Sequence, residues 1–155
     1  MITKLLNFLI ILPKHIASYF EWTGSLVARI TVGYVFMLTG WGKLQSLDRV
    51  TEYFASLSIP APHIITPFVA GLECFGGLFL ILGVLTRISA GGLAVTMIIA
   101  IITAKWEDID SLHRLLGFEE TLSLVIFTWL AISGAGKVSI DYLIERRFLP
   151  TPKHM

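Results

Sequence analysis

The chain of 155 residues is 55% hydrophobic, only 15% charged, and carries a formal net charge of +1. Soluble domains carry roughly 25% charged residues, so this composition indicates a membrane protein. The near-neutral charge argues against a nucleic-acid surface, and the single cysteine, Cys74, excludes an internal disulfide or a cysteine-based metal site.

The first 22 residues form a separate segment whose apolar run is too short to cross a bilayer. Residues 5–12 are mostly apolar, and Pro13 follows them. About eight apolar residues cannot span a hydrocarbon core of about 30 Å. We therefore expect an amphipathic helix on the membrane surface. An uncleaved signal peptide is the alternative, although no Ala-x-Ala-like cleavage site follows.

Four later stretches are apolar enough to suggest membrane spans of about 20 residues each. We predict an all-α, integral membrane domain over residues 23–142, built as a four-helix transmembrane bundle, with a tail over 143–155. A short surface helix is expected in the first outer loop, with Asp48 as a plausible N-cap and Pro60 near its end. The predicted spans are 24–44, 64–85, 88–104 and 115–132.

One face of the first predicted span carries both of its charges and two of its glycines. Arg29, Gly33, Phe36, Gly40 and Lys43 follow one another at steps of four, three, four and three, which places them on a single helical stripe. Charges and glycines in a span favour the bundle interior over lipid. The alternative for either charge is a residue that snorkels to the membrane surface.

The second predicted span contains a single ionisable side chain, Glu73, near its middle. A carboxyl group at that depth costs roughly 2.5–3.5 kcal/mol on insertion scales, so it is rare and usually has a partner. Gly76 and Gly77 follow one turn later and would allow close helix packing. Glu73 is therefore the main candidate for a functional residue.

The distribution of lysine and arginine predicts the orientation. These residues concentrate in the N-terminal segment, the second-to-third turn and the tail, so both termini are expected in the cytoplasm. Lys43, Glu73, Glu119 and Glu120 then share the outer half of the bundle. We expect Lys43 to pair with Glu119 or Glu120, with Glu73 below them; whether Lys43 also reaches Glu73 is left open.

Several short motifs, in order and over about residues 25–142, resemble the DoxX/DoxD family of small bacterial membrane proteins. The glycine-rich sequence around Lys43 and the one that follows Glu73 are the central two. The motifs are Gly40-Trp41-Gly42-Lys43-Leu44, Ile59-Pro60-Ala61-Pro62, Glu73-Cys74-Phe75-Gly76-Gly77, Gly83-Val84-Leu85-Thr86-Arg87, Gly117-Phe118-Glu119-Glu120 and Gly136-Lys137-Val138-Ser139-Ile140-Asp141.

The resemblance implies a four-helix protein of the bacterial inner (plasma) membrane with a leaning toward redox chemistry. The best-known named role in the family is the large subunit of a thiosulfate:quinone oxidoreductase. On that basis Glu73 would be the catalytic, proton-exchanging acid, while Lys43 and Glu119 would supply hydrogen bonds or charge pairing. The expected quinone or lipid pocket is lined by Trp41, Glu73, Gly76, Gly77 and Glu120.

Two other functions remain open at this stage. The sequence holds no recognisable electron carrier, so a quinone-linked role requires either a protein partner or a direct reaction of the substrate at the quinone. The chain could instead be a non-catalytic membrane partner, such as an accessory subunit of a redox-stress or metal-handling peptide system, in which the polar residues are struts. A small carrier is the third possibility, and it would need homo-oligomerisation to form a pore.

Overall fold

The computed structural model describes residues 9, 14 and 20–148. Within them the chain is all-helical, as predicted, and α5 and α6 are long and apolar enough to cross a membrane. The predicted N-terminal surface helix lies almost entirely outside the described residues. The helices are α3 (Glu21–Gln45), α4 (Leu47–Ser56), α5 (Pro62–Leu82), α6 (Thr86–Ala104), η2 (Trp106–Asp108), α7 (Leu112–Leu116), α8 (Glu119–Ser133) and α9 (Ile140–Phe148).

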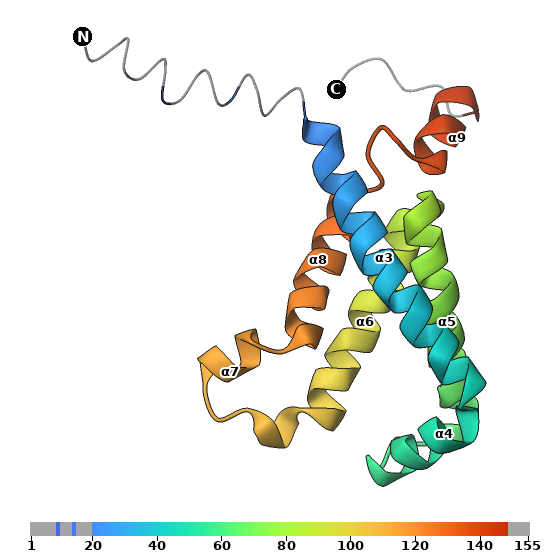
Figure 1. Cartoon of the computed structure of the whole chain (residues 1–155), viewed down its shortest axis with the longest axis vertical. Helices are drawn as coiled ribbons and strands as arrows, with labels where there is room; N and C mark the ends of the chain where they lie inside the picture. Colours follow the sequence, from blue (N-terminus) through green and yellow to red (C-terminus); the bar gives the residue numbers. More distant parts are fainter. Residues whose placement is uncertain (1–8, 10–13, 15–19, 149–155) are drawn as a thin grey trace.

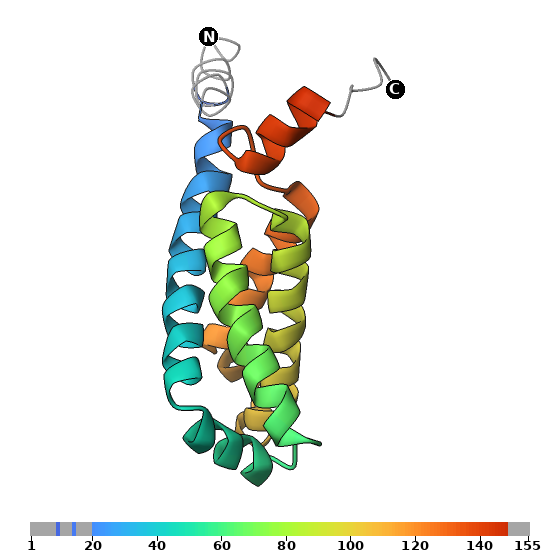
Figure 2. The same ribbon diagram turned by 90° about the vertical axis from the view of Figure 1, so that its right-hand side faces the viewer.

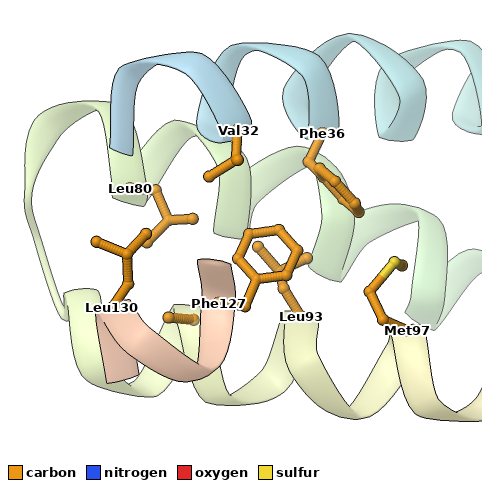
Figure 3. Close-up of a cluster of buried hydrophobic side chains, with 8 residues drawn as sticks. Val32, Phe36, Leu80, Leu93, Met97, Phe127 and Leu130 are labelled. Carbon is orange, nitrogen blue, oxygen red and sulfur yellow. The ribbon is translucent and has the colours of Figure 1, made fainter. Parts of the chain in front are cut away.

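Four of these helices, α3, α5, α6 and α8, pack lengthwise against one another (Figures 1 and 2). Their inner faces meet in an apolar core toward the end where α3 begins (Figure 3). Phe36 of α3 and Phe127 of α8 form its centre, edge to face, with ring centroids 4.8 Å apart, a favourable aromatic geometry. The other core residues are Val32, Leu80, Ala90, Leu93, Met97 and Leu130.

The closest helix contact joins α3 to α5 and depends on glycine. A Cβ atom on Gly40 would lie 2.3 Å from the backbone nitrogen of Cys74, and one on Gly77 would lie 2.5 Å from that of Met37. The two backbones therefore touch, as small residues permit in membrane helices. The predicted stripe on α3 is confirmed, because its members from Arg29 to Gly40 are buried and Lys43 is half-buried.

A short helix, α4, occupies the loop between α3 and α5, at the end of the molecule opposite to α9 (Figure 1). Its N-cap position is Ser46, and Asp48 lies in its first turn, so Asp48 is not the N-cap that the sequence suggested. Ala61, in the left-handed conformation, turns the chain into α5, which begins at Pro62. Proline suits that position because its missing N–H would have no helical partner.

The segment predicted as the fourth span, 115–132, does not form one continuous helix. The chain breaks at Gly117 and Phe118, between α7 and α8, and Phe118 has an extended backbone with ψ 141°. The Thr121 hydroxyl donates to the Leu115 carbonyl across the break at 2.7 Å. Because α8 has 15 residues, it is only about 22 Å long, shorter than a hydrocarbon core of about 30 Å.

The other end of the molecule is closed by the segment that follows α8. Gly83 ends α5 at φ 68°, a left-handed conformation that favours glycine. The carboxylate of Asp141 accepts hydrogen bonds from the backbone N–H groups of Leu85 and Thr86, both at 2.8 Å, and so caps α6. The predicted tail begins within α9, and its residues 149–155 lie outside the described part.

Candidate functional site

Lys43 and Glu73 form an ion pair between α3 and α5. The lysine Nζ lies 2.6 Å from Glu73 Oε1, and the glutamate side chain is only 4% exposed. The pair forms because the glycine contact brings the two helices close enough for a side chain near the end of α3 to reach the middle of α5. A buried carboxylate needs such a partner, since an unpaired charge at that position is costly.

The second oxygen of Glu73 remains without a hydrogen-bond partner in the part of the chain that the structure describes. A buried acceptor left unpaired costs roughly 1–3 kcal/mol, so native structures rarely keep one without a reason. The Thr66 hydroxyl, on the same face of α5 two turns earlier, is also buried and unpaired. Two unmet polar groups on one helix face indicate a place where a polar ligand or a proton could be accommodated.

The site is buried on one side and open on the other. Glu73 is closed in next to Cys74, whose backbone touches Gly40, whereas the Lys43 side chain is 30% exposed. Lys43 therefore connects the buried carboxylate to the surface of the helix bundle. Such an arrangement can hold a charge in the interior and exchange protons with a molecule that approaches along the lysine.

The structure separates the other predicted site residues from this pair. Lys43 pairs with Glu73, and neither Glu119 nor Glu120 has an ion-pair partner among the described residues, contrary to the expected pairing. Glu119 is exposed and Glu120 half-buried in the first turn of α8. Trp41 is 54% exposed and, two residues from Lys43, points to a different face of α3.

The two glycines predicted to line a pocket serve helix packing instead. A Cβ atom on Gly76 would lie 3.4 Å from Leu93 of α6. One on Gly77 would lie 2.6 Å from the backbone oxygen of Gly33 in α3. Both faces are therefore filled by protein, and a ligand at Glu73 would have to lie on the side of Lys43.

Sequence reasoning missed a second polar cluster at the opposite end of the same α3 face. Arg29 is 1% exposed and donates to the carbonyls of Leu80 at 3.3 Å and Val138 at 2.5 Å. It is therefore an interior residue and does not snorkel. Nearby, Asp141 caps α6. The signal for Arg29 was its place on the glycine stripe. Asp141 stood out only as the last residue of a motif shared with the DoxX/DoxD family, and the motif gave it no role.

Large apolar side chains cover the outside of the long helices. They include Phe68 and Phe75 on α5, Ile102 on α6 and Val125 on α8, all more than half exposed. Soluble monomers rarely expose continuous apolar surface on this scale. The fold and the site together define an all-helical membrane protein that holds a buried lysine–glutamate pair.

Comparison with known proteins identifies the family. The DoxX family model matches residues 24–106, which include both Lys43 and Glu73. The chain belongs to the DoxX family. No solved structure matches the chain significantly.

Three curated relatives support this membership. Over 83% of this chain and 97% of its own length, "Inner membrane protein YqjF" of Escherichia coli is 30% identical. "Putative oxidoreductase CatD" of Bacillus subtilis is 33% identical over 76% of this chain and 84% of its own. "Inner membrane protein YphA" of Escherichia coli is 29% identical over 75% and 86%.

Proposed function

We propose that this protein is the membrane subunit of a quinone-linked redox system, in which Glu73 exchanges a proton with the quinone head group. The observation that carries the proposal is the buried, unpaired oxygen of Glu73 beside an oxygen already bound by Lys43. An ionisable residue at membrane depth is a functional candidate by default. The name of the Bacillus subtilis relative, an oxidoreductase, favours the same class.

All four long helices cross the bacterial inner membrane in this proposal, with both termini in the cytoplasm. Trp22 and Trp41 are both exposed on α3, and nineteen residues of helix separate them by about 28 Å. This distance matches a hydrocarbon core bounded by two aromatic belts. The short α8 would cross most of the membrane, and α7 together with the break between α7 and α8 would cover the remaining outer part. The names of the two Escherichia coli relatives favour the inner membrane.

The residues of the pair would have distinct roles toward a bound quinone. The quinone supplies the redox chemistry, since its reduction takes up two electrons and two protons. Lys43 would hold one oxygen of Glu73 and stabilise its negative charge, while the other oxygen would accept a hydrogen bond from a hydroxyl of the reduced head group or, when protonated, donate its proton to an oxygen of the quinone. The unpaired oxygen therefore fits a head group on the Lys43 side. The faces of Gly76 and Gly77 are filled by protein and leave no room for a head group.

The sequence holds one cysteine and no dinucleotide-binding glycine motif, so the electrons would come from another protein or from a substrate that reacts directly at the quinone. We include a partner subunit in the proposal. The exposed apolar helix faces would contact lipid, that partner or a second copy of this chain.

The first experiment is mass spectrometry of the small molecules extracted from the detergent-purified protein. We expect a quinone in the wild type and its loss from Glu73→Ala. Glu73→Gln keeps the shape of the side chain but cannot take up a proton, so it should fold normally and lose quinone-dependent turnover. Glu107→Gln, an exposed acid in η2, is the matched control. Unchanged turnover in Glu73→Gln would contradict the catalytic role.

A second candidate is a non-catalytic membrane partner in which the ion pair fixes the register of α3 on α5. The short distance within the pair and the touching backbones favour it. Hydrogen bonds between membrane helices average only about 0.6 kcal/mol, so this function predicts a small stability loss in Glu73→Gln and no bound quinone in the wild type. Co-purification of a defined protein partner without any ligand would support it.

A further inference from the structure

The last described helix, α9, is attached firmly to the bundle although none of its residues is buried. The Asp141 N–H donates to the Gly83 carbonyl at 2.8 Å, and its carboxylate caps α6. Ser139 accepts a hydrogen bond from the Tyr142 N–H at 3.1 Å and so caps α9. Figures 1 and 2 show α9 beyond the ends of α5 and α8 and inclined to them. No described residue covers this helix, so its side chains are available to a membrane or to a partner.

The exposed surface of α9 combines large apolar side chains with positive charge. Leu143 is 62% and Phe148 70% exposed. Three exposed cations lie with them on α9 and the segment before it, namely Lys137, Arg146 and Arg147. Of the acids in this region, Asp141 is occupied by backbone N–H groups, which leaves Glu145. This combination is typical of helices that lie in the membrane interface.

The opposite end of the molecule has the reverse character. Arg49, Lys105 and Arg114 are outnumbered there by acids on α4, η2 and the loop that follows η2. These acids are Asp48, Glu52, Glu107, Asp108 and Asp110. Among the described residues, cations therefore outnumber acids at the α9 end and not at the α4 end.

Exposed apolar side chains of the long helices lie on the near side of a groove that borders α9. This groove of about 670 Å³ separates α9 from the start of α6, and Leu85, Ile88 and Ile144 are among its lining residues. Leu85 and Ile88 are exposed on the outside of the bundle. A lipid surface that surrounds α6 therefore reaches α9 directly.

We propose that α9 lies in the headgroup layer of an anionic bilayer leaflet. Leu143 and Phe148 enter the boundary between headgroups and acyl chains, and Lys137, Arg146 and Arg147 bind the lipid phosphates. Each cation near an anionic membrane surface contributes roughly fivefold to the association. The Asp141 contacts fix α9 at this level relative to the bundle. The proposal does not depend on the chemistry at Glu73.

The test places a fluorescent label on α9 in the full chain. Leu143→Cys, in a Cys74→Ala background, is labelled with a nitrobenzoxadiazole dye and reconstituted into nanodiscs of phosphatidylcholine alone or mixed equally with phosphatidylglycerol. We expect blue-shifted emission and at least threefold weaker quenching by acrylamide in the anionic nanodiscs. Acrylamide is uncharged, so the surface charge does not repel it. Glu107→Cys, labelled in the same way, provides a water-exposed reference.

The triple variant Lys137→Gln, Arg146→Gln, Arg147→Gln should lose the difference between the two lipid compositions. Glu145→Gln, an exposed change on the same helix, should keep it. Equal protection of the label in both nanodiscs would overturn the role of the cations. Quenching as strong as that at the reference position in both would overturn the proposal as a whole and favour a water-soluble protein as the occupant of this face.

Discussion

The two ends of one α3 face carry similar charges in opposite structural settings. Arg29 is buried, and two backbone carbonyls bind it beneath the segment that follows α8. Lys43, fourteen residues later and about 21 Å along the axis, binds an acid that keeps a free oxygen, and it remains partly exposed. Both ends keep a buried polar atom without a partner among the described residues, the Nε of Arg29 and the second oxygen of Glu73. They differ in two other respects. Only the Lys43 end is partly exposed, and only there is the unmet atom part of a carboxylate, which can take up a proton.

The largest effect should come from the glycine contact on which the Lys43 end depends. Gly40→Ala places a Cβ atom against the backbone of α5, where no flexible side chain can yield. We expect a loss of about 3 kcal/mol in the free energy of unfolding, measured in mixed dodecylmaltoside and SDS micelles. Gly42→Ala, with no atom within 4 Å of the added carbon, should be neutral or slightly stabilising. Equal stability of the two variants would contradict the close contact.

The next largest effect is expected at the end of the molecule where Arg29 is buried. Arg29→Met should lower the free energy of unfolding by about 2 kcal/mol, because it leaves the Leu80 and Val138 carbonyls without their donor. Quinone retention should stay at the wild-type level. Loss of the quinone with an intact fold would show that the two ends do not act separately.

The matching substitution at the other end, Lys43→Met, should lower the stability less than Arg29→Met does but should affect quinone retention more. It leaves Glu73 without its partner but removes only one interhelical contact, so we expect about 1 kcal/mol of destabilisation. Quinone retention and turnover should both be lost, because Glu73 loses the side chain that holds its Oε1. Parallel measurements on Arg29→Met and Lys43→Met compare the two ends directly.

The smallest effect is expected at the start of α8. Glu119 is exposed and has no ion-pair partner among the described residues. Glu119→Gln should therefore change stability by less than about 0.5 kcal/mol and leave quinone retention intact. A large loss of turnover in this variant would restore the sequence-based role of Glu119 and move the site toward α8.

The sequence was sufficient for features that repeat along a helix. The stripe from Arg29 to Lys43 and the isolated acid in α5 identified the interior faces, because residues three or four positions apart lie on the same face of a helix. The pairing of Lys43 was not accessible in this way, since it depends on how closely α3 and α5 approach and on how far a lysine extends. The cap by Asp141 depends on a contact between distant segments, which hydropathy does not encode. The break at Gly117 depends on local hydrogen bonds, such as that of Thr121 with Leu115, to which hydropathy is equally blind.

The pairing of Lys43 with Glu73 also bears on how the chain enters the membrane. Glu73 alone at mid-membrane would oppose the insertion of α5 by roughly 2.5–3.5 kcal/mol, and its partner lies in α3, which is synthesised first. Only the short α4 separates the two helices. In the proposed topology, the hairpin from α3 to α5 would therefore insert as one unit, in which the earlier helix carries the counter-ion for the later one. The ion pair would then favour the release of both helices from the translocon together.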